Sequence, residues 1–92
     1  MQKILLIAGC VALLGTSEAP AQTRCKVMDP TGMPLNTRTG PNGTIVGTLR
    51  NGVLVTITDN TVDGQGRPWV HVEDLNTGEP YGWVFREFIA CY

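Results

Sequence analysis

Leu35-Asn36-Thr37-Arg38 and Gly82-Trp83-Val84 mark the two ends of the stretch that decides the fold of this chain. Between them, short runs rich in Val, Ile and Thr are separated every few positions by Gly, Pro or Asn. No window within residues 22–92 carries apolar residues at helical spacing over three turns. Alternation with a period of two, interrupted by turn residues, is typical of short β-strands. The stretch therefore predicts an all-β domain.

The strands can be placed by this alternation. Val53, Val55 and Ile57 share one face of a strand and are candidates for the core, whereas Leu54 on the other face should be partly exposed. Asn51-Gly52 in front of this strand favours a tight hairpin. We expect strands over residues 25–27, 35–38, 45–49, 53–58, 69–73, 81–84 and 89–91, a polar loop over 59–66 and one short 3₁₀ turn within 85–88. Strands of this length form a small barrel.

The order of these signals resembles that of bacterial SH3 domains. The residues that carry the resemblance are Leu35, Asn36, Arg38, Gly40, Pro41, Gly47, Gly52, Val55, Ile57, Trp69, Val72, Gly82, Trp83 and Val84. The chain departs from the family pattern in the segment 63–68 before Trp69 and in its cysteine pair. The resemblance implies a small SH3-like β-barrel of five to seven short strands. It also implies a module that binds peptides, cell-wall peptidoglycan or another protein.

Residues 1–21 have the organisation of a secretory signal peptide. Lys3 precedes an apolar run over 4–14, and Ala19-Pro20-Ala21 supplies the small residues that favour cleavage before Gln22. The run is shorter than the roughly 20 residues that span a bilayer. We therefore expect an exported domain over residues 22–92, periplasmic or extracellular, with no membrane span.

An alternative interpretation treats residues 7–10 as a lipobox in which Cys10 is lipidated and anchors the protein to a membrane. The apolar run continues after Cys10, where a lipoprotein normally becomes polar. This continuation favours the signal peptide.

Cys25 and Cys91 remain after removal of the signal peptide, near the two ends of the predicted domain. In an oxidising compartment two such cysteines are expected to form a disulfide. The Cα atoms of a bridged pair lie about 5.5 Å apart, so the first and last strands should lie side by side.

Composition excludes several classes of function. The formal net charge of −1 arises from acidic and basic residues spread along the chain, which leaves no basic stripe for nucleic acid. The chain has one serine, Ser17 in the signal peptide, and one histidine, His71, so the mature domain has no serine–histidine triad. A single histidine also falls short of the three or four ligands of a zinc site. We expect a non-enzymatic protein without cofactor or metal.

Residues 59–64 resemble the first half of a calcium loop, because Asp59 and Asp63 are placed as in such loops and Gly64 is the sixth residue. The twelfth position is Val70, where a calcium loop needs a bidentate glutamate. We therefore favour a solvated hairpin loop, and calcium binding stays open as an alternative.

Aromatic residues give the best binding signal, because folds of the Src homology 3 type bind extended chains in aromatic grooves. Trp69 alternates with Val70 and Val72, so we expect it to be the exposed tryptophan. Trp83 is expected in the core with Phe88. Tyr81 is a second candidate for ligand contact.

Asn36 and Arg38 share one face of their strand near the proposed groove. A structural role would have Asn36 bond to turn backbone and Arg38 pair with Asp59 or Glu87. A ligand role is equally open, because a planar guanidinium suits the carboxylates of wall peptides.

The sequence thus predicts an exported, non-enzymatic module that binds an extended peptide or a peptidoglycan stem peptide around Trp69, Tyr81, Arg38 and Asn36. The alternative is a periplasmic scaffold that binds another exported protein and takes no small ligand. The oligomeric state is left open.

Overall fold

The structure is a computed structural model that describes residues 24–92. The predicted signal peptide and Cys10 lie outside the described residues. Within them the fold is all-β, as predicted, and no helix is long and apolar enough to cross a bilayer. The elements are β1 (Cys25–Val27), β2 (Leu35–Arg38), β3 (Ile45–Leu49), β4 (Leu54–Val62), β5 (Pro68–Asp74), β6 (Pro80–Phe85), the 3₁₀ turn η2 (Arg86–Phe88) and β7 (Ile89–Cys91).

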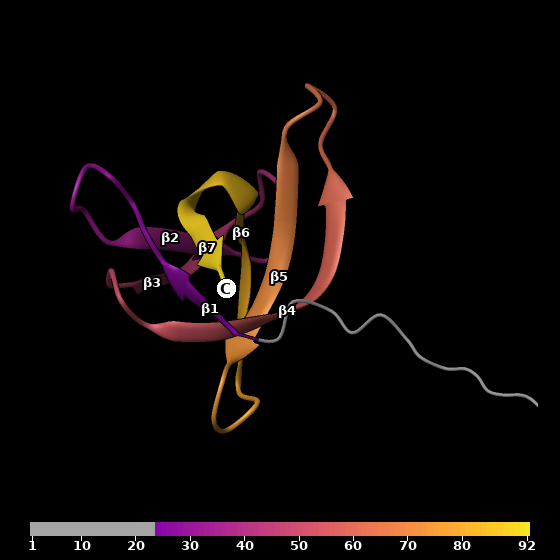
Figure 1. The fold of residues 1–92 in the computed structure, drawn as a ribbon. Helices are drawn as coiled ribbons and strands as arrows, with labels where there is room; N and C mark the ends of the chain where they lie inside the picture. Colours follow the sequence, from indigo (N-terminus) through magenta and orange to yellow (C-terminus); the bar gives the residue numbers. More distant parts are fainter. Residues whose placement is uncertain (1–23) are drawn as a thin grey trace, which may run out of the picture.

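The seven strands of residues 24–92 form one antiparallel sheet in the order β3-β2-β6-β5-β4-β1-β7. The sheet curls on itself, and the β4–β5 hairpin extends away from the other strands (Figure 1). Curling brings β1 and β7, from opposite ends of the domain, to the same side. The two edge strands of this sheet are β3 and β7.

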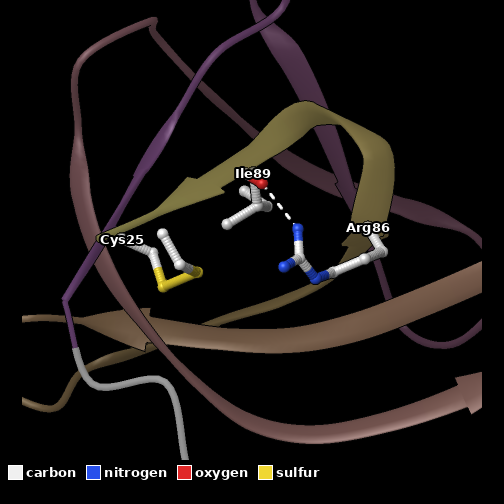
Figure 2. Close-up of a disulfide and its surroundings, with 4 residues drawn as sticks. Cys25, Arg86 and Ile89 are labelled. Atoms are coloured by element: carbon white, nitrogen blue, oxygen red, sulfur yellow. Dashed lines mark hydrogen bonds between the residues drawn. A yellow bond between two sulfur atoms is a disulfide. The ribbon is translucent and has the colours of Figure 1, made fainter.

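A disulfide joins β1 and β7, the first and last strands in sequence, as the sequence predicted. Cys25 and Cys91 lie opposite each other in the β1–β7 register, with their Cα atoms 3.9 Å apart and a separation of 66 positions in sequence. Figure 2 shows the bridge near Arg86 of η2. The Arg86 guanidinium donates from Nη1 to the Ile89 carbonyl at 2.6 Å, which ties η2 to the start of β7.

The core is built from the inward faces of these strands. Val55 and Ile57 are buried as predicted, Val53 is half-buried against them, and Leu54 is 37% exposed. Alternation along residues 53–57 thus predicted the facing of all four residues. The buried core residues are Cys25, Val27, Leu35, Leu49, Val55, Ile57, Val70, Val72, Val84 and Ile89.

The predicted loop over residues 59–66 is wrong in its first half. Asp59 to Val62 continue β4 and pair with β5 through Thr61↔Trp69 and Val62↔Pro68. A register shift between Ile57 and Asp59 lets the strand continue beyond the core. Polar residues form strand here because this part of the hairpin is solvent-exposed and its ladder bonds do not depend on side-chain polarity.

The hairpin predicted at Asn51-Gly52 is also wrong, because β3 and β4 are not neighbours in the sheet. A two-residue type I′ hairpin needs positive φ at both central residues, whereas here Gly52 has φ +91° and Asn51 does not have positive φ. The Asn51 side chain instead brackets Asp29, accepting its N–H at 2.7 Å and donating to its carbonyl at 2.9 Å. The turn therefore leads the chain from β3 across to the far side of the sheet.

Candidate functional site

A half-open groove of about 170 Å³ lies beside β2. Its lining residues come from β2, β5, β6, η2 and the loop between β1 and β2. It is lined by Asp29, Pro34, Leu35, Asn36, Arg38, Trp69, Phe85 and Phe88. Ligand pockets for whole small molecules usually exceed about 300 Å³. This volume suits one or two side chains of an extended ligand.

Strand alternation explains why these side chains meet. In β2, Leu35 and Thr37 are buried while Asn36 and Arg38 occupy the opposite face. Trp69 of β5 lies directly opposite Phe85 of β6, and both alternate with buried valines. The outward faces of three strands thus supply the polar and aromatic walls of the groove.

The prediction that Trp69 is exposed is wrong, although the residue does line the groove. Its side chain points to the outer face as expected, but it is 1% exposed. The Phe85 ring lies on it with centroids 4.2 Å apart, and its indole Nε1 donates to Asp63 Oδ2 at 2.9 Å. Side chains from other segments cover this part of the outer face. The alternation of residues along one strand does not reveal such contacts.

Asp63 organises that cover. Its Oδ2 also accepts Arg67 Nε at 2.9 Å and Asn42 Nδ2 at 3.2 Å, and the carboxylate side chain is 2% exposed. The hydrogen bond from Trp69, followed by those from the backbone of Arg67 and Gln65, holds the pKa of the Asp63 carboxyl well below its usual range against the opposing effect of burial. The charged form is therefore built into the wall behind Trp69.

Arg67 completes the network from the solvent side. Its Nη2 donates to Asn42 Oδ1 at 3.1 Å, and its guanidinium carbon lies 5.1 Å from the centroid of the Phe85 ring. These contacts connect the tip of the β4–β5 hairpin to the turn between β2 and β3 and to β6. Both aromatic walls of the groove are fixed by residues of one network.

Arg38 is half-buried at one end of the groove, and neither ion pair proposed for it, to Asp59 or Glu87, forms. Its Nη1 donates to the Gly43 carbonyl at 2.8 Å, which anchors the guanidinium to the β2–β3 turn. Within residues 24–92 the Asp63–Arg67 pair is the single ion pair. The charge of Arg38 is therefore not matched by a carboxylate of this domain.

Asn36 is exposed in the middle of the groove. The structural role considered for it, a bond to turn backbone, is not made, since its side-chain amide has no hydrogen-bond partner among residues 24–92. The amide is free to donate and to accept.

Three lining residues were not identified from the sequence: Asp29, Pro34 and Leu35. Asp29 and Pro34 come from the β1–β2 loop, and Leu35 is the first residue of β2, which was predicted as a strand without a part in the groove. Asp29 Oδ1 accepts the N–H and the hydroxyl of Thr31 at 2.9 and 2.7 Å. Its Oδ2 has no partner in the described part of the chain.

Tyr81 lies outside the groove. Its hydroxyl donates to Asp74 Oδ2 at 2.8 Å, and the side chain packs against the core. This hydrogen bond raises the pKa of the Tyr81 hydroxyl and lowers the pKa of the Asp74 carboxyl. The pair closes the β5–β6 turn, a role that explains the tyrosine without a ligand.

Trp83, predicted in the core, is half-buried on the outer face next to Arg38. His71 packs against it edge to face with ring centroids 5.6 Å apart, and His71 Nδ1 lies 2.8 Å from Thr58 Oγ1. Trp69, predicted to be exposed, is thus buried, and Trp83, predicted to be in the core, is the more exposed of the two tryptophans. Phe88, predicted in the core, is half-buried and reaches both the core and the groove.

The residues considered for calcium do not form an isolated loop, because Asp59 belongs to β4 and Asp63 is engaged with Trp69 and Arg67. Among residues 24–92, no three His, Cys, Asp or Glu side chains are clustered for a metal ion.

Comparison with known proteins gives one match. The profile of the bacterial SH3 domain family matches residues 34–90. This range contains β2 to β6 and η2 completely and the first two residues of β7, and it leaves out β1. No curated protein and no solved structure matches the chain significantly.

Proposed function

The chain belongs to the bacterial SH3 domain family, and we propose that it is an exported, non-enzymatic module that binds an extended peptide or a peptidoglycan stem peptide in the groove around Arg38. Domains of this family are in general binding modules.

The observation that carries this proposal is the half-buried Arg38 beside an aromatic wall, with no carboxylate partner in residues 24–92. Partial burial makes an unmatched charge costly, and an incoming carboxylate would remove that cost. The guanidinium can form two parallel hydrogen bonds to such a group. Peptidoglycan stem peptides and chain ends of proteins both carry free carboxylates.

The shape of the groove supports an extended ligand. Pro34, Phe85 and Phe88 form an apolar surface next to the exposed amide of Asn36. A chain lying along β2 could place a side chain on the aromatic rings and a peptide group against the amide, as in other aromatic grooves that bind extended chains. The groove is too small to enclose a whole cofactor.

Export is supported by the signal-peptide pattern of residues 1–21 and by the Cys25–Cys91 disulfide, since disulfides persist in oxidising compartments. The periplasm or the cell exterior is the proposed location.

Binding can be tested by titrating soluble peptidoglycan fragments into purified Trp83→Phe protein, whose one remaining tryptophan, Trp69, lines the groove. A saturable change in fluorescence that is weakened in Trp83→Phe/Arg38→Gln supports the proposal. Arg50→Gln in the same background is the matched control, because Arg50 is exposed and does not line the groove. Unchanged fluorescence, with no binding by wild-type protein in calorimetry, would refute peptidoglycan as the ligand.

A second candidate function is a scaffold that binds another exported protein, and the observation that favours it is the edge strand β3. Ile45 and Val46 are 48% and 57% exposed, and β3 contains no charge and no proline. Edge strands without such protection can pair with a strand of another chain. Val46→Lys should abolish capture of a periplasmic partner while leaving peptidoglycan binding intact.

A further inference from the structure

We propose that the groove selects a zwitterionic peptide about three residues long, which places its carboxylate at Arg38 and its amine at Asp29. This inference rests on the proposed function, because it assigns the charge pattern and the direction of the ligand in the same groove. It follows from the positions of the two charged residues that line the groove.

Arg38 and Asp29 lie at opposite ends of the groove. Arg38 is the last residue of β2 and is bonded to Gly43 in the turn that follows. Leu35, the first residue of β2, lies opposite Leu49, and two residues beyond Leu49 the Asn51 side chain holds the backbone of Asp29. Asp29 therefore marks the Leu35 end of the strand.

The separation can be estimated from the strand between them. Three residue steps from Leu35 to Arg38 correspond to about 10 Å at the usual rise of a β-strand. An extended peptide of three residues spans about the same length between its terminal charges. A free tripeptide could therefore contact Arg38 with its carboxylate and Asp29 with its amine. A longer ligand with a side-chain amine and a carboxylate at that spacing could do the same.

Each charged group has open hydrogen-bonding capacity. One Arg38 donor is used by the Gly43 carbonyl, and no other partner of the guanidinium is present in residues 24–92. Thr31 occupies one oxygen of Asp29 and leaves the other open. A peptide bound in the reverse direction would place its amine at Arg38 and its carboxylate at Asp29. Like charges would then meet at both ends of the groove, so charge fixes the direction of binding.

Two further charged residues, Arg67 and Asp63 of the wall behind Trp69, do not compete for the ligand. Arg67 and Asp63 neutralise each other behind Trp69, with their closest atoms 2.9 Å apart. Asn36, between the two ends, offers an amide with no partner in the described domain to the peptide groups of the ligand. The arrangement of charge along the groove is therefore positive, neutral and negative.

The probes are free trialanine, trialanine C-terminal amide and N-acetyl-trialanine. Binding is measured by changes in the ¹H–¹⁵N NMR spectrum, which also reports whether each variant is folded. In wild-type protein we expect amidation and acetylation each to weaken binding about tenfold, the size of one lost charged hydrogen bond. In Arg38→Gln the effect of amidation should vanish and that of acetylation persist, and in Asp29→Asn the reverse.

Asn retains the oxygen that bonds Thr31, so Asp29→Asn should preserve the loop. Arg50→Gln is the matched control and should behave as wild type. Equal binding of the three peptides to wild-type protein would overturn this inference and leave the proposed function in place. Binding of peptidoglycan fragments without binding of free trialanine would also overturn it. Failure of both fragments and peptides to bind would refute the proposed function itself.

Discussion

Gly82 of β6 lies so close to Arg38 of β2 that a Cβ atom built on Gly82 would be 2.8 Å from the Arg38 carbonyl oxygen. Real Cβ atoms essentially never come this close to a backbone atom. Gly82 also has φ +123°, a conformation that residues with side chains rarely adopt. The glycine of the Gly82-Trp83-Val84 signal therefore permits the β2–β6 contact on which one wall of the groove depends.

Gly82→Ala should destabilise the protein by about 1–3 kcal/mol, from backbone strain and displacement of β2. Chemical denaturation measures the change in the free energy of unfolding. Gly64→Ala is the control, because nothing lies within 4 Å of its Cβ position and its φ is not positive, and its effect should stay within about 0.5 kcal/mol. Equal stability of the two variants would contradict the account of Gly82.

Asp63 should make stability depend on acidity. Its folded-state pKa is depressed below the ordinary value of 3.8, so its contribution is fully present above about pH 4 and is lost as pH falls toward the folded-state pKa. The denaturation midpoint of wild-type protein should therefore fall more steeply from pH 5 to pH 2 than that of Asp63→Asn, which does not titrate at this position. If the midpoints of the two proteins fell in parallel with pH, ionisation of Asp63 would not contribute to the pH dependence of stability.

Reduction of the Cys25–Cys91 disulfide should cost about 4 kcal/mol, because the bridge restricts a loop of 66 residues in the unfolded chain. Urea denaturation with and without reductant measures this difference. The double variant Cys25→Ala/Cys91→Ala should be destabilised and insensitive to reductant. A wild-type midpoint unchanged by full reduction would count against the prediction.

The environments of the two tryptophans can be separated by quenching. Trp69 is 1% exposed whereas Trp83 is half-buried, so acrylamide should quench Trp83→Phe less than wild-type protein. The emission of Trp83→Phe should also lie at shorter wavelength, as expected for a buried indole. Stronger quenching in Trp83→Phe than in wild-type protein would show instead that Trp69 is the more exposed tryptophan, as the sequence predicted.

Sequence patterns predicted the features that depend on local alternation and on chain closure. Val55 and Ile57 were placed in the core because their period of two is set by the strand itself. The pairing of Cys25 with Cys91 followed from the number of cysteines expected in the mature chain, and β1 and β7 lie side by side as that pairing required. All seven expected strands exist, although three of them extend beyond their predicted bounds.

The site was less predictable because it depends on contacts between distant segments. Alternation placed Trp69 on the outer face but could not show that Phe85, Asp63 and Arg67 cover it. Asp29 enters the groove through its bonds to Asn51, which is 22 residues away in sequence. Local patterns give the direction of a side chain, and tertiary packing decides whether that direction leads to solvent.

The bridge between the first and last strands also has a mechanical consequence. Residues before Cys25 and after Cys91 are joined through a covalent link whose Cα atoms are 3.9 Å apart. Tension applied to the chain on either side of the domain passes through this link and does not load the hydrogen bonds of the enclosed strands. The domain should therefore resist stretching in an atomic force experiment until the disulfide is reduced, and the groove should keep its shape under load.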